Sequence, residues 1–214
     1  MLISLEYRFM FVANLKTAST AIEAALRPHA EIAIVESRFG KHMPLADAKE
    51  RFAWVFDFVR REDLFIFGVM RDPVDYTVSL YNSHTCERFK NHPDLYTGTI
   101  TFDQFLREWA HRNPDQFIAQ HTRFLDANGE IGADYIMSYD NLAAGFKQVA
   151  TKIGIPTSLP LVAQNVSRPR LLPCSLSDDQ RRYIAAHFAS DTIFMENHCD
   201  RFLVRPDNPL SAGR

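Results

Sequence analysis

Apolar residues are arranged along the chain in two kinds of block, which alternate. Short and nearly continuous apolar runs predict buried strands at residues 9–13, 32–37, 64–70 and 133–140. Apolar residues three or four positions apart predict amphipathic helices beginning after Ser19 and over residues 44–59, 73–81, 101–112, 142–153 and 178–188. Because strands alternate with helices, an α/β fold is expected, with a central parallel sheet flanked by helices in three layers.

Local signals mark where several of these helices begin and end. Residues whose side chains cap helix N-termini precede four of the segments: Asp72, Thr101, Asp140 and Ser177. Pro73 suits the first helical position after Asp72, and Gln180 completes a capping box with Ser177. Gly154 is expected to end the helix that precedes it.

Two loops that follow predicted strands carry residue types that bind anions. In parallel sheets, ligands bind at the carboxyl ends of the strands. The first loop, "NLKTAST", places Lys16 and several hydroxyls at a helix start, where unpaired N–H groups favour an anion. The second loop, "RDPVDYTVS", places Arg71 at a strand end and Ser79 about two helical turns further on. One anion-binding group in each loop predicts a ligand with two separated phosphate-like ends.

The first loop differs from a Walker A loop because the first glycine of the chain is Gly40. A Walker A loop needs glycines at fixed spacing so that the backbone can wrap a triphosphate. The sequence therefore disfavours magnesium-dependent nucleotide hydrolysis and favours another kind of nucleotide.

Composition narrows the class of protein further. A chain of 214 residues suits one domain, expected over 1–205 with a flexible tail at 206–214. The net charge of -2 gives no footprint for nonspecific nucleic-acid binding. Three cysteines do not make a disulfide framework, and no apolar run reaches the ~20 residues that span a bilayer. A soluble, cytoplasmic protein is expected.

The two loops resemble the binding motifs of sulfotransferases that use 3′-phosphoadenosine-5′-phosphosulfate (PAPS). "LKTASTAI" is similar to the 5′-phosphosulfate loop of that family, and "RDPVDYTVSLY" to its 3′-phosphate motif. Later stretches, "DYIMSYDNLAAGFKQVATKIGI", "NVSRPR" and "LSDDQRRYIAAHFASDTIFM", resemble the family in the same order. The resemblance implies a P-loop-NTPase-like fold and in-line transfer of a sulfuryl group from PAPS to a hydroxyl or amine. Adenosine 3′,5′-bisphosphate would be the second product, and no metal would be needed.

The resemblance also implies roles for individual residues. Lys16 would contact the leaving oxygen of the sulfate. The 5′-phosphate would be held by the residues of the same loop: Thr17, Ala18, Ser19 and Thr20. Arg71 and Ser79 would hold the 3′-phosphate, and two residues would close over the nucleotide: Ser167 and Arg168. Tyr76 stands where the family often has an arginine, so another basic residue could complete the 3′-phosphate site.

The acceptor must lose a proton, so a general base is expected. His42 is the first candidate, because it lies in the loop after the second predicted strand, where the family often has a histidine. Glu36 is the second candidate, followed by His84 and His121. The histidines and cysteines have no closed four-ligand spacing, so no metal site is expected.

Two other functions stay open from the sequence. One is a P-loop nucleotide kinase or NTPase, and the other is a non-catalytic nucleotide-binding protein with the same fold. The acceptor of a sulfotransferase could be a small molecule, a carbohydrate, a lipid or a peptide. The sequence leaves the oligomeric state open.

Overall fold

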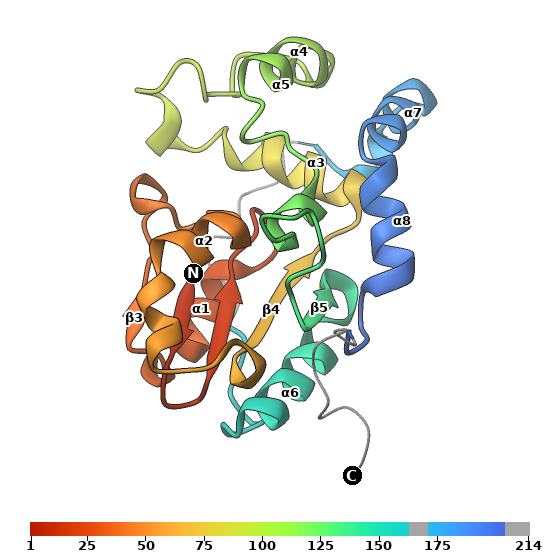
Figure 1. Cartoon of the computed structure of the whole chain (residues 1–214). Coiled ribbons are helices and arrows are strands. Elements are labelled where there is room, and N and C mark those ends of the chain that lie inside the picture. The colour runs from red at the N-terminus through yellow and green to blue at the C-terminus, as the bar shows by residue number, and fades with distance from the viewer. Residues whose placement is uncertain (163–170, 204–214) are drawn as a thin grey trace.

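The computed structural model describes residues 1–162 and 171–203. They contain a five-stranded sheet in the order β3-β1-β2-β4-β5 (Figure 1). The strands are β1 (Leu2–Ser4), β2 (Phe9–Val12), β3 (Ile32–Ala33), β4 (Phe65–Met70) and β5 (Tyr135–Ser138). The α-helices of the described residues are α1 (Ser19–Leu26), α2 (Leu45–Arg51), α3 (Pro73–Ser83), α4 (Phe102–Gln104), α5 (Ala110–Arg112), α6 (Leu142–Ile153), α7 (Asp178–His187) and α8 (Ala189–His198). The tail expected at 206–214 lies outside the described residues.

The sheet is mixed, so the prediction of a parallel sheet was wrong for one strand. β2, β4 and β5 are parallel, whereas β1 is antiparallel to both β2 and β3. Only residues 5–8 connect β1 to β2, and a parallel pair needs a crossover of a dozen residues or more. The strand expected at 32–37 is confirmed only over its first two residues, in β3.

Side chains alternate across the sheet and fill two separate cores. Phe9 and Phe11 of β2 lie on the face that α1 and α6 cover, and Met10 and Val12 lie on the opposite face. The opposite face packs against apolar residues of α2 and α8. Because both faces are covered, β2 and β4 are buried at every position, which explains their continuous apolar sequence.

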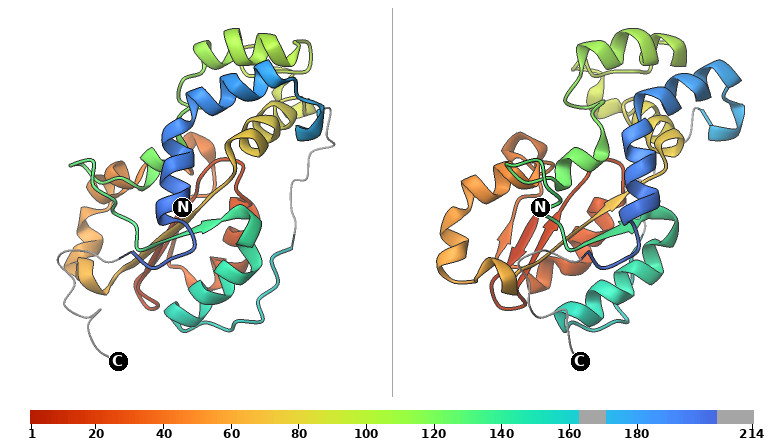
Figure 2. Two further views of the ribbon diagram at one scale, coloured as in Figure 1. Left: turned by 90° about the vertical axis from the view of Figure 1, so that its right-hand side faces the viewer. Right: turned by 45° about the vertical axis from the view of Figure 1, so that its right-hand side comes forward.

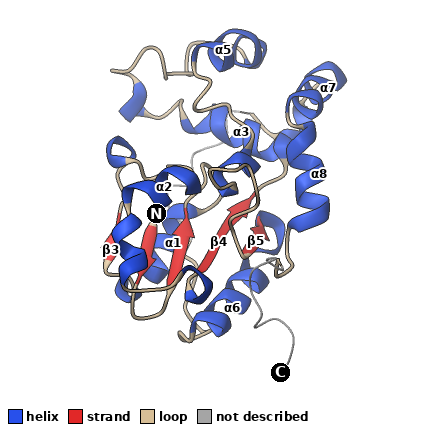
Figure 3. Cartoon of the chain, in the orientation of Figure 1, coloured by secondary structure: helices blue, strands red, loops and turns tan. Residues whose placement is uncertain are grey.

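A third apolar cluster lies beyond the end of the sheet where β4 leads into α3 (Figures 1 and 2). It joins α3 to the segment 102–112 and to α7 through the rings of Tyr76, Phe105, Trp109 and Phe188. The segment 102–112 contains α4, a π-helical turn and α5 in direct succession. Figure 3 draws the segment around α5 as helix. This cluster forms a roof above the carboxyl ends of the strands.

Most of the predicted helix starts are confirmed. The Asp72 carboxylate accepts the N–H groups of Val74 and Asp75, and capping boxes begin α4 and α7. Asp140 is not a cap, which corrects the prediction. It lies inside a 3₁₀ turn, and α6 begins after it with Asn141 at the N-cap and no side-chain cap.

The second predicted helix is shorter than its apolar pattern suggested. The helix expected over 44–59 ends at Arg51, and a separate 3₁₀ turn covers Ala53–Asp57. Within the described residues, no helix has both the length and the apolar character that crossing a membrane requires.

Candidate active site

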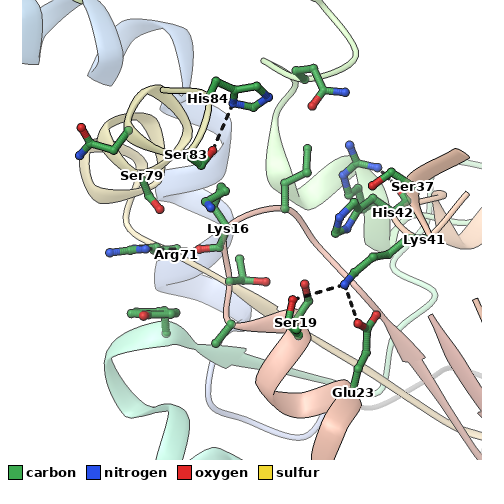
Figure 4. A pocket seen from close by; sticks show the side chains of 18 of the residues that line it. Lys16, Ser19, Glu23, Ser37, Lys41, His42, Arg71, Ser79, Ser83 and His84 are labelled. Carbon is green, nitrogen blue, oxygen red and sulfur yellow. Dashed lines mark hydrogen bonds and ion pairs between the residues drawn. The ribbon is translucent and has the colours of Figure 1, made fainter. Parts of the chain in front are cut away.

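A cavity of about 1280 Å³ lies at the carboxyl ends of the parallel strands (Figure 4). Its walls include residues 15–21 after β2, Arg71 after β4 and Tyr139 after β5. Three consecutive parallel strands thus deliver loops to one place, as expected for ligand sites in such sheets. The roof of the cavity comes from α3, the 3₁₀ turn that follows it and residues 115–118.

The loop after β2 has the backbone shape of an anion-binding nest. Lys16 and Ala18 have positive φ angles of 56° and 57°, in the left-handed region that glycine usually occupies. Among the described residues, no acceptor pairs with the backbone N–H groups of residues 16–20. Consecutive unpaired N–H groups at a helix start form a concave site for an anion. The loop therefore has the backbone geometry of an anion site without containing glycine.

Asn14 and Thr17 hold this loop in place from inside the fold. Asn14 is buried; its side chain accepts a hydrogen bond from Leu15 N at 2.8 Å and donates one to Val69 O at 3.4 Å. The Thr17 hydroxyl donates to Asn14 O at 3.2 Å. Thr17 thus points its hydroxyl back into the loop, so its backbone N–H is the donor left for an anion.

Lys16 is the cation of this loop, and no described residue forms an ion pair with its ammonium group. Burial lowers the pKa of Lys16 to about 8, and the charges of Arg88 and Arg71 act in the same direction. An anion placed among these three cations would be attracted to all of them and would raise the pKa of Lys16 again.

Arg71 extends toward the same loop from the end of β4. Its Nη1 donates to Lys16 O at 3.3 Å, and its guanidinium lies 4.2 Å from the centre of the Tyr139 ring. Its Nε is buried and has no partner among the described residues. Ser79, two turns into α3, is half-buried and lines the cavity beside Arg71 (Figure 4). The two residues predicted to bind a second anion therefore lie together.

Gln120 fixes the backbone of Arg71, and sequence patterns gave no sign of it. Its side chain accepts from Arg71 N at 3.0 Å and donates to Arg71 O at 2.8 Å. Asp191, fully buried in α8, accepts from the backbone N–H groups of Gln120 and His121 at 2.8 and 2.9 Å. A chain of hydrogen bonds thus connects α8 to the residue at the end of β4.

The side chain of His42 lies on one side of the loop after β2, and the side chains of Lys16, Arg71 and Ser79 lie on the opposite side (Figure 4). Its Nδ1 is 2.9 Å from Ala13 O, and a carbonyl can only accept, so Nδ1 carries the proton. Burial lowers the pKa of His42 to about 3, with the bond to Ala13 opposing it and the charges of Lys41 and Arg123 assisting. The ring is therefore neutral, with Nε2 as an acceptor.

The alternative bases differ in their positions. His84 also lines the cavity, and its Nδ1 lies 3.0 Å from Leu80 O, so its Nε2 is again the acceptor. Burial lowers the pKa of His84 to about 4. The Glu36 side chain lines the cavity but is 62% exposed. His121 does not line the cavity; its Nδ1 lies 2.6 Å from the Asp191 carboxylate.

Lys41 was not predicted, yet it is almost fully buried beside the first loop. Its ammonium lies 2.6 Å from the Glu23 carboxylate and 3.4 Å from the Thr20 hydroxyl (Figure 4). A lysine next to a candidate histidine has no distinctive sequence signal, because only the fold brings Glu23 to it. Glu23 also accepts from the N-terminal ammonium of Met1 at 3.1 Å, so two buried cations share one carboxylate. Lys41 in turn positions the Thr20 hydroxyl.

Besides His121, three residues singled out in the sequence lie away from the described cavity or outside the described part of the chain. Tyr76 is buried in the third apolar cluster, where its hydroxyl donates to Gln116 O at 2.9 Å, so it cannot replace an arginine in the cavity. Ser167 and Arg168 lie outside the described residues. In the part of the chain that the structure describes, no group of three or more histidine, cysteine or carboxylate side chains could hold a metal ion.

No protein-family model matches the chain, and no curated protein matches it significantly. Among solved structures, the chain is similar to a sulfotransferase from Alicyclobacillus acidocaldarius, with 17% sequence identity and a TM-score of 0.48. The similarity covers 92% of this chain and 96% of the other. At that TM-score the similarity supports no transfer of function, so the function is argued from the residues of the cavity.

Proposed function

We propose that the protein is a sulfotransferase that moves a sulfuryl group from PAPS to a hydroxyl or amine and releases adenosine 3′,5′-bisphosphate. The observation that carries the proposal is the pairing of two anion sites in one cavity. One is the nest at residues 16–20 with Lys16, and the other is Arg71 with Ser79. A nucleotide with phosphate groups at both its 5′ and 3′ positions would occupy both sites.

The residues present fit this donor. Unpaired N–H groups of the nest suit a 5′-phosphate, and the partnerless Nε of Arg71 is a buried donor that an additional phosphate oxygen would satisfy. Two sites need a ligand with two anionic ends, which a simple monophosphate lacks. Ser167 and Arg168 are proposed to close over the nucleotide, as the motif resemblance implies.

The transfer itself needs positioning and charge stabilisation. The acceptor oxygen would form a bond to sulfur while the bond from sulfur to the 5′-phosphate oxygen breaks. Lys16 would stabilise the negative charge that develops on that leaving oxygen. The proton of the acceptor would pass to Nε2 of His42, which the bond from Nδ1 to Ala13 O leaves free to accept.

A nucleotide kinase or NTPase is the alternative within the same type of fold. The left-handed residues Lys16 and Ala18 show that a tight loop can form here without glycine. The absence of glycine therefore weighs less against a phosphate-wrapping loop than the sequence suggested. A triphosphate bound along one loop does not need the second anion site at Arg71 and Ser79. That site therefore favours a sulfotransferase over a kinase or NTPase.

We expect adenosine 3′,5′-bisphosphate to raise the melting temperature of the protein in the presence of a metal chelator, because both anion sites are built from protein groups. Adenosine 5′-monophosphate should stabilise the protein less, since it leaves the second site without a partner. Differential scanning fluorimetry would measure both. Equal stabilisation by ATP with magnesium, and none by the bisphosphate, would favour the kinase alternative and contradict the proposal.

Replacing Gln120 by leucine should weaken binding of the bisphosphate about tenfold while leaving the affinity for adenosine 5′-monophosphate nearly unchanged. The leucine removes both hydrogen bonds that hold the Arg71 backbone, and a tenfold loss corresponds to about 1.4 kcal/mol, within the range of one such bond. Calorimetric titration of both nucleotides measures the ratio. Gln116→Leu is the matched control, because Gln116 lines the same cavity without contacting Arg71 through its side chain. An equal loss for both nucleotides would indicate a general structural role instead.

A further inference from the structure

Arg123 is a buried cation in the wall of the cavity, apart from the residues proposed to bind the donor. It belongs to the 3₁₀ turn Gln120–Phe124, and only 7% of its surface is exposed. Its Nη1 donates to His42 O and its Nη2 to Asp115 O at 3.3 Å. Its Nε is buried and has no partner among the described residues.

Arg123 forms no ion pair with a described carboxylate, although the Asp115 carboxylate is near enough to favour its charged form. Both of its hydrogen bonds end on backbone carbonyls, and no described carboxylate lies within ion-pair distance. Burial lowers the pKa of the Arg123 guanidinium, although arginine keeps its proton in proteins. A buried charge without a counter-ion is costly, and a ligand anion would remove that cost.

Arg123 lies beside His42, on the side of the cavity away from the two proposed phosphate sites. The cations that influence Lys16 are Arg88 and Arg71, whereas those that influence His42 are Lys41, Arg123 and the N-terminal ammonium. Two groups of cations therefore flank the first loop from different sides. Lys41 and the N-terminal ammonium share the Glu23 carboxylate, at 2.6 and 3.1 Å, whereas no described carboxylate lies within ion-pair distance of Arg123.

We propose that Arg123 forms a subsite for an anionic group of the acceptor, so that the acceptor is a hydroxyl or amine compound bearing a carboxylate or a similar oxyanion. This inference rests on the proposed sulfotransferase function, since it assumes that the donor occupies the other side. Remaining N–H groups of the guanidinium would bind the acceptor anion. The cavity of about 1280 Å³ exceeds the ~300–1,000 Å³ of common ligand sites, which leaves room for a donor and an acceptor together.

An anion at Arg123 would also act on the candidate base. Arg123 holds the backbone of His42 through its carbonyl, so a ligand bound by Arg123 lies next to that histidine. A negative charge there opposes the field of the neighbouring cations and makes Nε2 of His42 more basic. Binding of the acceptor anion at Arg123 would thus increase the ability of His42 to take the proton of the acceptor.

The test uses pairs of probes that differ in charge and little in shape. The protein is first saturated with adenosine 3′,5′-bisphosphate, and calorimetry then measures the dissociation constants of acetate against acetamide and of 4-hydroxyphenylacetate against its amide. We expect the carboxylate of at least one pair to bind about tenfold or more tightly than its amide, as for a hydrogen bond to a charged group. Arg123→Met should abolish that preference, and Arg123→Lys should keep part of it.

Arg27→Met is the matched control, because Arg27 lines the same cavity but is exposed at its rim and has no proposed role in donor binding. It should leave the preference for the carboxylate unchanged. No preference in the unmodified protein would overturn the subsite whatever the variants do, as would a preference that survives in Arg123→Met or is lost equally in Arg27→Met. If the bisphosphate itself fails to bind, the proposed function fails first, and the same pairs titrated without nucleotide still test the anion subsite.

Discussion

Lys16→Met is expected to lower the rate of sulfuryl transfer by about a thousandfold, the effect of losing one well-placed donor to a developing charge. The ammonium is the only side chain of residues 15–20 that carries a full charge, and no described carboxylate neutralises it. Single-turnover kinetics with PAPS would measure the loss. Circular dichroism and the melting temperature should show that the fold is retained.

Arg27→Met is the control for this variant, because Arg27 also lines the cavity but is exposed at its rim. It removes the same net charge and should cost little, since exposed charges interact weakly through water. A comparable loss in both variants would mean that Lys16 acts only through the general potential of the cavity.

The pH dependence of donor binding gives an independent measure of Lys16. Its pKa of about 8 in the free protein means that the ammonium loses its proton as the pH rises through this value. A bound anion favours the charged form and raises that pKa, so the dissociation constant should rise up to tenfold per pH unit above about 8. Lys16→Met should remove this dependence. A wild-type affinity that stays constant well above pH 8 would contradict the assigned contact.

His42→Asn should lower the rate of transfer by about a hundredfold to ten-thousandfold, the usual contribution of a general base. Binding of the bisphosphate should stay nearly unchanged, because His42 lies away from both proposed phosphate sites. The pKa of about 3 keeps the ring neutral throughout the neutral range. At low donor concentration, protonation of His42 should therefore not lower the rate between pH 7 and about pH 5. The unmodified protein and His42→Asn should show the same pH dependence over that range.

His84→Asn and Glu36→Gln provide the comparison for that experiment. His84 has the same tautomer and lines the same cavity, so it is the strictest control for a general effect of losing a buried imidazole. If the large loss follows His84 or Glu36 instead of His42, the base has been assigned to the wrong residue. The proposed sulfotransferase function would stand in that case.

The sequence predicted the parts of the fold that depend on local patterns. β2, β4 and β5 are buried on both faces, so their continuous apolar runs were visible, and Asp72 with Pro73 marked the start of α3. β1 was missed because it is three residues long and pairs through a tight turn. Its antiparallel direction follows from that turn, which no apolar pattern reports.

The candidate site divides in the same way. Lys16 and Arg71 could be brought together from the sequence, because each follows a strand of the same predicted sheet. Gln120 and Arg123 could not, since Gln120 reaches Arg71 across 49 positions and Arg123 reaches His42 across 81. Their roles depend on where the 3₁₀ turn Gln120–Phe124 packs, and that is decided by tertiary contacts alone.

The left-handed residues of the first loop restrict its backbone before any ligand binds. Lys16 and Ala18 each carry a side chain at φ near 57°, which costs about 1–2 kcal/mol per residue in the folded protein. Glycine would avoid that strain but would lose about 0.5–1 kcal/mol more entropy than alanine on folding. The two costs are similar in size, but residues with a Cβ have fewer backbone conformations open to them than glycine. A loop without glycine thus has fewer alternative shapes, and its ligand has less free energy to supply in ordering it.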